Sequence, residues 1–446
     1  MTETRAPARK PVLGSRFRWL WSSSVASNAG DGVTRTLLPL LVVASHPQPM
    51  VVAGLTAVNM LPWLLFALPA GVLADRHDRR RILLVSNVTR AAALLAAVAA
   101  FAAGTSLAVL YVLSFVLGIA ETLAETAAPA MLPDIVESEH LEHANGRLFA
   151  PQIILNEMAG PPLAGLLVGV GATLALATGG ALYGLAAVLL LGLAGVKAAP
   201  RTAPPPGTSA ARSLWEDLRT GVSFVLSRAA LTRTLAASAL YGLVYSATFS
   251  MLVLLAHRTL HLHATGYGLL LTVGSAGSIA GTWLAPRLAR RLPTLVLAQW
   301  SLILSGAAYV GLGLAGNTVL AGAAIFCNGL FMMSWNIPVL SLRQRFAPPE
   351  LQGRVMSVSR LCSWGTMPIG AALGGLLART TSVTTVFVSS GAVLILGSVA
   401  LLAPLRQDVL TGEQPESSRV PHPHRHRHQH QHHTDTERGE HDRGSV

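Results

Sequence analysis

Apolar residues fill most of this chain in long blocks, and short polar segments separate one block from the next. Each block runs for about 20 residues, the length of helix that crosses roughly 30 Å of hydrocarbon. The pattern therefore predicts an all-α membrane protein. Twelve transmembrane helices are predicted, at residues 20–43, 51–73, 82–103, 107–123, 149–168, 173–196, 233–255, 267–285, 295–314, 318–342, 355–377 and 383–402.

Basic residues indicate how the helices are oriented. Arginines gather in the loops after the even-numbered blocks, whereas the alternate loops hold little beyond Arg258 and Arg379. Cytoplasmic loops carry such an excess, so both termini are predicted to be cytoplasmic. The stretch from Met1 to Arg18 lacks the short apolar core and cleavage site of a secretory signal, so we expect the first helix to stay in the mature protein.

Composition narrows the function classes. The chain is 51% hydrophobic and only 12% charged, with a mean hydropathy of +0.50, whereas soluble domains carry about 25% charged residues. The net charge of +12 does not indicate a nucleic-acid partner, because the basic residues lie between apolar blocks and at the termini. Cys327 and Cys362 lie inside apolar blocks without metal-ligand spacing. No disulfide framework, zinc site or cofactor is predicted.

Two parts of the chain are alike, which indicates an internal repeat. In residues 141–167 and 351–377, Gly146-Arg147 corresponds to Gly353-Arg354 and Pro161 to Pro368. Six predicted spans lie on each side of a Pro-rich linker, so we expect two pseudo-symmetric six-helix bundles. The predicted parts are an N-terminal cytoplasmic tail (1–19), a first bundle (20–196), a linker with an amphipathic helix at 213–228 (197–232), a second bundle (233–405) and a disordered tail (406–446).

The C-terminal tail contains a run of histidines. Imidazole is the commonest metal ligand, so His422, His424, His426 and His428 offer a weak metal-binding site. Nothing in the tail fixes a ligand geometry, and we therefore favour a disordered tail with no resident metal.

The end of the second predicted helix carries a motif. Gly71, Asp75, Arg76 and Arg79 stand in the segment "GVLADRHDRRR". A positive-inside cluster explains the arginines but not the glycine and aspartate. The segment resembles the signature of the major facilitator superfamily, a G-x-L-A-D-R-x-x-R-R/K pattern between helices 2 and 3. This resemblance implies rocking six-helix halves and gating roles for the four residues.

A second motif lies in the fifth predicted helix. Gly160 and Pro161 resemble the Gly-Pro element that drug-exporting members carry there, which implies export rather than import. Small residues permit close packing, and a proline leaves a backbone carbonyl free, although an ordinary kink is the alternative. Further similarity, in "SNAGDGVTRTLLPL" and "AAPAMLPDIV", is to enterobactin exporter-like and macrolide-efflux-like members. The arginine that many drug/proton antiporters carry in helix 4 is missing before Gly118.

Charged and polar residues inside apolar helices are the best candidates for the site, because each charge costs roughly 2.5–3.5 kcal/mol at the bilayer centre unless it is paired or hydrated. The candidates in the first bundle are Asn28, Asp31, Arg35, Glu121, Glu125 and Glu157. The carboxylates can carry a proton or attract cationic substrates. Alternatively, Asp31 and Arg35 form a structural pair, Glu121 pairs with Arg35 or Arg90, and Glu125 lies near the membrane edge.

The second bundle offers aromatic candidates. Tyr241 and Tyr245 share a face of the seventh predicted helix with Thr248. Asn336 belongs to the tenth with Asn328 and Trp335, and Arg360 shares a face of the eleventh with Trp364. Aromatic rings with a few polar groups suit a cavity for amphiphilic molecules, although packing is the commoner reason for such spacing.

These patterns favour a secondary active transporter. We expect an exporter of drugs, siderophores or secondary metabolites in the bacterial inner membrane, acting by alternating access and proton antiport. An importer and a non-transporting receptor or scaffold are the alternatives. No nucleotide-binding loop or catalytic residue set stands out, so no enzyme is predicted. The expected partners are a small-molecule substrate, protons and the lipid bilayer, with no nucleic acid, and we expect a monomer.

Overall fold

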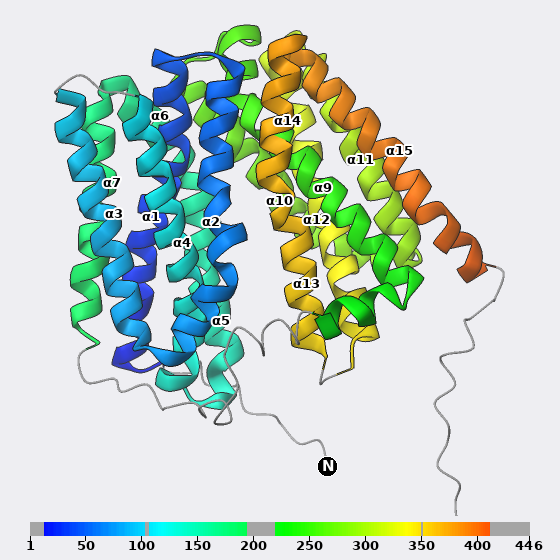
Figure 1. Cartoon of the computed structure of the whole chain (residues 1–446), viewed down its shortest axis with the longest axis horizontal. Helices are drawn as coiled ribbons and strands as arrows, with labels where there is room; N and C mark the ends of the chain where they lie inside the picture. The colour runs from blue at the N-terminus through cyan, green and yellow to red at the C-terminus, as the bar shows by residue number, and fades with distance from the viewer. Residues whose placement is uncertain (1–12, 103–106, 194–218, 349–350, 411–446) are drawn as a thin grey trace, which may run out of the picture. The chain divides into compact units, whose positions relative to one another are not determined.

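The computed structural model describes residues 13–102, 107–193, 219–348 and 351–410, and this part of the chain is helical without strands. The first half contains α1 (Ser15–Ser45), α2 (Pro49–Arg76), α3 (Arg79–Ala102), α4 (Leu107–Ile135), the short 3₁₀-helix η1 (Ser138–His140), α5 (Leu141–Pro151), the π-helix η2 (Gln152–Ala159), α6 (Gly160–Val170) and α7 (Ala172–Leu191). The predicted fifth span is thus one path through α5, η2 and α6 (Figure 1).

The second half contains α9 (Ala229–Leu254), the π-helix η3 (Leu255–Thr259), α10 (Ala264–Ala289), α11 (Thr294–Gly313), α12 (Thr318–Phe346), α13 (Gln352–Gly365), α14 (Met367–Thr380) and α15 (Val383–Leu410). Local sequence explains several helix starts. Pro49 and Pro368 occupy the first turns of α2 and α14, where a missing N–H costs nothing. Asn317 caps α12 by accepting a hydrogen bond from the Leu320 N–H.

Helix length and apolarity agree with a membrane protein. In the described ranges, eleven helices are long and apolar enough to cross a membrane. With 31 residues, α1 is also long enough. It carries more polar residues than the others, because Asn28, Asp31 and Arg35 interrupt its apolar sequence.

Two departures from the predicted spans have visible causes. α4 continues beyond Leu123 to Ile135 despite Pro129 and Pro133. Its last turns bury Ala127, Met131 and Leu132 in an apolar cluster with α1, α3 and α7, and this packing maintains the helix. The eleventh span is divided at Thr366 into α13 and α14, as the fifth is divided by its π-helix.

Glycines bring the two halves into backbone contact. α2 packs against α14, and α6 packs against α10. A Cβ on Gly268 of α10 would lie only 2.3 Å from the carbonyl oxygen of Pro161, and one on Gly375 of α14 would lie 2.3 Å from the Cβ of Ala53. These contacts lie toward the end that carries the connection from α1 to α2, called here the α1–α2 end. Arg258 of η3 also donates to the backbone oxygen of Pro47 there.

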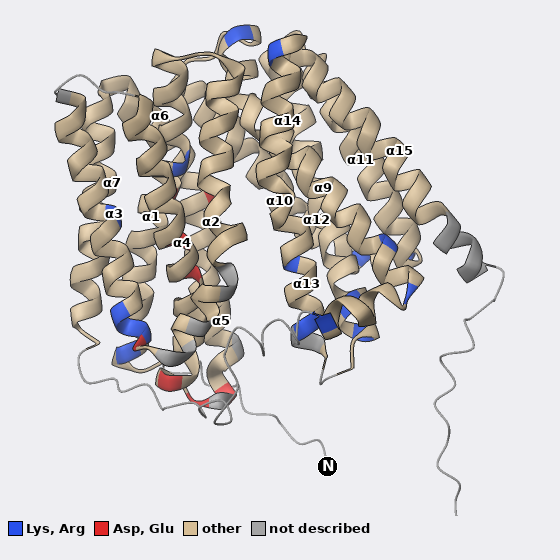
Figure 2. Cartoon of the chain, in the orientation of Figure 1, with Lys and Arg blue, Asp and Glu red and all other residues tan. Residues whose placement is uncertain are grey.

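Charged residues gather at the opposite end, called here the α2–α3 end, where α2 joins α3 (Figure 2). Arginines at the start of α3, the end of α10, the end of α12 and the start of α13 belong to it: Arg79, Arg80, Arg81, Arg287, Arg290, Arg291, Arg343, Arg345 and Arg354. Arg258 in η3 and Arg379 in the last turn of α14 belong to the other ends of their helices. The arrangement follows the alternation predicted from the loops.

Two predicted segments lie mainly outside the described residues. These are the Pro-rich part of the linker and the histidine-rich tail with His422, His424, His426 and His428. Of the predicted amphipathic helix, residues 219–228 are described, and 219–226 are helical. Its Val225 is buried against Leu231, Val355 and Val358 of the second half, so this face packs on protein.

Candidate functional site

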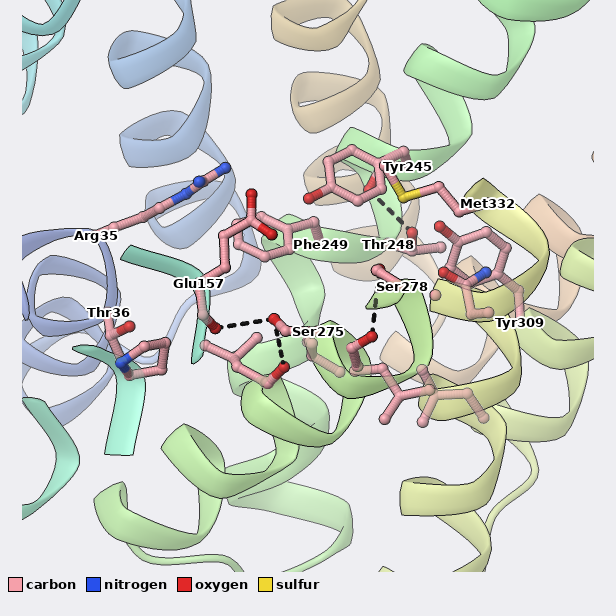
Figure 3. A pocket seen from close by; sticks show the side chains of 18 of the residues that line it. Arg35, Thr36, Glu157, Tyr245, Thr248, Phe249, Ser275, Ser278, Tyr309 and Met332 are labelled. Atoms are coloured by element: carbon pink, nitrogen blue, oxygen red, sulfur yellow. Dashed lines mark hydrogen bonds between the residues drawn. The ribbon is translucent and has the colours of Figure 1, made fainter. Parts of the chain in front are cut away.

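A cavity of about 180 Å³ lies between the two halves (Figure 3). α1, η2 and α6 line it from the first half, and α9, α10, α11, α12 and α15 line it from the second. Its polar and charged lining consists of Arg35, Thr36, Asn156, Glu157, Tyr245, Thr248, Ser275, Ser278, Tyr309 and Asn328. The apolar part of the lining includes Phe249, Leu252, Met332 and Met333. A mostly apolar cavity with a few polar groups suits a small organic ligand.

Arg35 is the cation of this cavity. It lies in the middle of α1 and is nevertheless solvent-exposed, because its side chain projects into the cavity. Its guanidinium carbon lies 5.8 Å from the ring centroid of Phe249 on α9. No ion pair joins Arg35 to a carboxylate in the part of the chain that the structure describes. The guanidinium can therefore interact with a ligand as well as with the aromatic face.

Three aromatic rings form a column on α9 that reaches Arg35. The ring centroids of Tyr241 and Tyr245 are 6.2 Å apart, and those of Tyr245 and Phe249 are 5.5 Å apart. The residues follow one another at intervals of four, which places them on one helix face. Of this aromatic column, Tyr245 and Phe249 line the cavity and offer aromatic surface to a ligand, whereas Tyr241 is buried and does not line it.

Glu157 enters the cavity from the first half. It belongs to the π-helix η2, and Figure 3 shows its carboxylate near Phe249 and on the same side as Arg35. The backbone oxygen of Glu157 accepts a hydrogen bond from Ser275 Oγ of α10 at 2.8 Å. Short π-helices occur frequently at functional sites.

A buried ion pair lies beside the cavity, within the first half. Arg90 of α3 is 1% exposed, and its Nη1 donates to Asp31 Oδ1 at 3.0 Å and to Ser27 Oγ at 3.1 Å. The Tyr183 hydroxyl donates to the same Asp31 oxygen at 2.8 Å. The structure thus pairs Asp31 with Arg90. The pair between Asp31 and Arg35 that sequence spacing suggests is wrong, because Arg35 projects into the cavity.

The carboxylates of α4 line two smaller cavities around this pair. Glu121, Asp31 and Arg35 line a cavity of about 50 Å³. Glu125, Asn28, Asp31 and Arg90 line another of about 90 Å³. Neither glutamate forms an ion pair with an arginine in the described ranges, contrary to the suggested pairing of Glu121. Because α4 continues to Ile135, Glu125 lies well inside the helix and not at its end.

The small cavities and the large one share residues. Arg35 and Phe249 line both the 180 Å³ and the 50 Å³ cavities, and Asp31 lines both smaller ones. A series of cavities with charged residues in their walls therefore connects Glu157 through Arg35 and Asp31 to Glu125. The second half contributes no carboxylate to it: between Ala229 and Arg406, Glu350 is the only acidic residue of the sequence.

Comparison with known proteins identifies the family. Residues 3–440 match the model of a family described as transmembrane secretion effectors. The chain belongs to this family. It is a transporter of the major facilitator superfamily, as its sequence resemblance implied.

Relatives of this transporter include named efflux proteins. It is 26% identical to the multidrug efflux pump Tap of Mycolicibacterium fortuitum, over 93% of this chain and 100% of that one. Identity to the macrolide efflux protein A of Streptococcus pyogenes is 22%, over 88% and 96% of the two chains. Identity to the enterobactin exporter of Citrobacter koseri is 28%, over 74% and 78%.

Solved transporter structures share the fold. A bacterial homologue of the iron transporter ferroportin, in an inward-facing state, superimposes with a TM-score of 0.68 at 19% identity, over 88% of this chain and 99% of that one. A peptide transporter complexed with sulfate gives a TM-score of 0.71 at 15% identity, over 90% and 96%. At these identities the likeness concerns the fold alone.

The two motifs of this transporter lie in different surroundings. Gly160 packs against Gly32 of α1, and Pro161 lines the central cavity. In the loop motif, the buried Arg79 donates to Asp134 Oδ2 at 2.5 Å and to the backbone oxygen of Ala74 at 3.0 Å. A Cβ on Gly71 would meet no atom within 4 Å. The side chains of Asp75 and Arg76 lie outside the described residues.

Other predicted residues of this transporter lie away from the cavity. Asn336 and Arg360 are exposed and do not line it. The ring centroid of Trp364 on α13 is 4.7 Å from that of Trp63 on α2, which is a contact between the halves.

Sequence reasoning missed four residues that the structure brings to these sites. Sequence spacing suggests Arg90 only as a partner for Glu121, although a charge inside the third apolar block is itself a signal. Tyr183, Phe249 and Ser275 carry no signal in one sequence, because their importance depends on which helix lies opposite.

Proposed function

We propose that this transporter exports small amphiphilic organic molecules from the cytoplasm through the 180 Å³ cavity. The observation that carries the proposal is the lining of that cavity, where one exposed guanidinium meets the rings of Tyr245 and Phe249 between the two halves. A site at the interface of two repeats can be opened to either side as the halves rock. The drug and siderophore exporters among the relatives support export over import.

The proposal includes a topology. α1 and the eleven other spans cross the bilayer as twelve helices, and the arginine-rich α2–α3 end faces the cytoplasm of a bacterial inner membrane. The α1–α2 end then faces outward, and its glycine contacts hold the halves together there. This arrangement corresponds to a state in which substrate enters from the cytoplasm.

Proton antiport supplies the energy in this proposal. Carboxylates embedded in a membrane protein mark ion and proton pathways. Four carboxylates that lie away from the ends of their spans belong to the first half: Asp31, Glu121, Glu125 and Glu157. They line the series of cavities that ends at the proposed substrate cavity, so a proton and a substrate can exclude one another at Arg35 and Glu157.

The test is accumulation of a panel of fluorescent cationic, anionic and neutral amphiphiles in efflux-deficient cells that express the protein, with and without a protonophore. Export predicts lower accumulation that the protonophore abolishes. Glu121→Gln and Glu125→Gln should change the pH dependence of export, whereas Glu137→Gln on the exposed surface should not. Equal accumulation across the panel, or identical pH profiles for all three variants, would contradict the proposal.

A further inference from the structure

The fifth span, which runs through α5, η2 and α6 and is called here helix five, lacks two backbone hydrogen-bond donors at the border of η2 and α6. Pro161 and Pro162 have no N–H. In an α-helix, N–H groups at positions 161 and 162 would donate to the carbonyls of Glu157 and Met158. In a π-helix, an N–H group at position 162 would donate to the carbonyl of Glu157. The N–H of Gly160 is used by the carbonyl of Leu155. The carbonyl of Glu157 therefore has no donor within its own helix in either register.

The missing donors come from the other half of the protein. Ser275 Oγ donates to the carbonyl of Glu157 at 2.8 Å, and Thr272 Oγ1 donates to the carbonyl of Met158 at 2.8 Å. Both hydroxyls lie on α10, and each is farther from the carbonyl of its own helix, at 3.1 Å for Thr272 and 3.2 Å for Ser275. Figure 3 shows the bond from Ser275 to Glu157 beside the cavity.

The backbone contact between α6 and α10 makes these bonds possible. Gly268 lies one turn before Thr272, and a Cβ there would lie 2.3 Å from the carbonyl oxygen of Pro161. On the facing helix, a Cβ on Gly165 would lie 2.5 Å from the carbonyl oxygen of Ala264. The two backbones are thus close enough for short hydroxyl side chains to span the interface.

We propose that Thr272 and Ser275 are positioning residues that cap helix five across the interface and stabilise the state in which the halves are packed at the α1–α2 end. When the halves separate there, water in the opened cavity hydrates the two carbonyls. Without the hydroxyls, the packed state buries two unsatisfied acceptors, while the separated state is unaffected. The same bonds hold the π-helical segment that carries Glu157. This inference deepens the proposed function, because it names residues that set the balance between its two states.

The test measures the distance between the halves without any substrate. Spin labels are placed at Val170 and Leu314, two exposed positions at the ends of α6 and α11. The two native cysteines, Cys327 and Cys362, are replaced by alanine so that only these positions are labelled. The distance between the labels is measured by electron double resonance in nanodiscs. The combined variant Thr272→Val and Ser275→Ala should raise the ratio of separated to packed molecules by at least about tenfold. Ser278→Ala is the matched control, because Ser278 lines the same cavity but donates to Gly274 of its own helix.

A second background separates capping from general packing. Pro161→Ala and Pro162→Ala together restore the two N–H groups, so helix five can bind its own carbonyls. In that background, loss of the hydroxyls should change the ratio less than about twofold. An unchanged distance distribution in the original background, an equal shift in both backgrounds, or an equal shift in Ser278→Ala would overturn the inference. A protein that shows the predicted shift but exports nothing would overturn the proposed function and leave the caps in place.

Discussion

Neutralising Asp31 should destabilise the first half strongly, because it leaves the buried guanidinium of Arg90 without a counter-charge. Arg90 is 1% exposed and Asp31 is 12% exposed, and the two side chains are joined at 3.0 Å. Asp31→Asn retains an oxygen that can accept from Tyr183 and Arg90, so the change removes charge and little volume. The variant therefore isolates the cost of an uncompensated buried cation.

The expected size of this effect follows from the burial of the pair. Removing one partner of a buried ion pair costs about 3–5 kcal/mol, which corresponds to a fall of about 6–20 °C in Tm for a unit the size of one bundle. Replacing both partners by neutral groups is close to neutral. The double variant Asp31→Asn with Arg90→Met should therefore melt at a higher temperature than Asp31→Asn alone.

Thermal unfolding of purified protein in detergent, followed by tryptophan fluorescence, measures the original protein, the two single variants and the double variant at one pH. Arg90→Met alone should cost less than Asp31→Asn, since Asp31 lines two cavities and remains partly hydrated. A Tm for Asp31→Asn within about 2 °C of the original protein, or a double variant that melts as low as Asp31→Asn, would refute the reasoning.

Two further changes test the contact between the halves and the loop motif. Gly268→Ala should abolish export, because its Cβ would lie 2.3 Å from the backbone oxygen of Pro161. Gly184→Ala is the control and should leave export unchanged, because a Cβ there would meet no atom within 4 Å. Both are measured by dye accumulation at matched expression. Asp75→Asn should lower the rate of export without changing Tm or membrane insertion, as the motif resemblance implies, and an unchanged rate would contradict a gating role.

The helices could be predicted because membrane insertion imposes a length and a composition that one sequence displays. Each predicted block overlaps a helix, or a helix path, of the structure. The errors occurred where tertiary packing overrides a local signal. Pro129 and Pro133 argue for an early end to α4, but burial of Met131 and Leu132 keeps the helix intact. The π-helix before Gly160 has no local signature that distinguishes it from a proline kink.

The site was less predictable, because a sequence indicates which residues are costly to bury but not what lies opposite them. Asp31 and Arg35 stand one turn apart, which favours a pair along the helix. The neighbouring α3 supplies Arg90 instead, and this leaves Arg35 for the cavity. The choice between the two arginines depends on the rotation of α1 against α3, and helical spacing within α1 contains no information about it.

The two halves share a fold but divide its chemistry. The second half has one acidic residue in the sequence between Ala229 and Arg406, and it supplies the aromatic column of the cavity. The first half holds the intramembrane carboxylates and the two arginines near them. Proton-driven export would therefore change charge in one half while the other half holds the apolar part of the substrate. Arg35 lines both the 180 Å³ cavity and the cavity of Glu121, so under the proposed function it is the residue that would link the binding of substrate in one to the charge in the other.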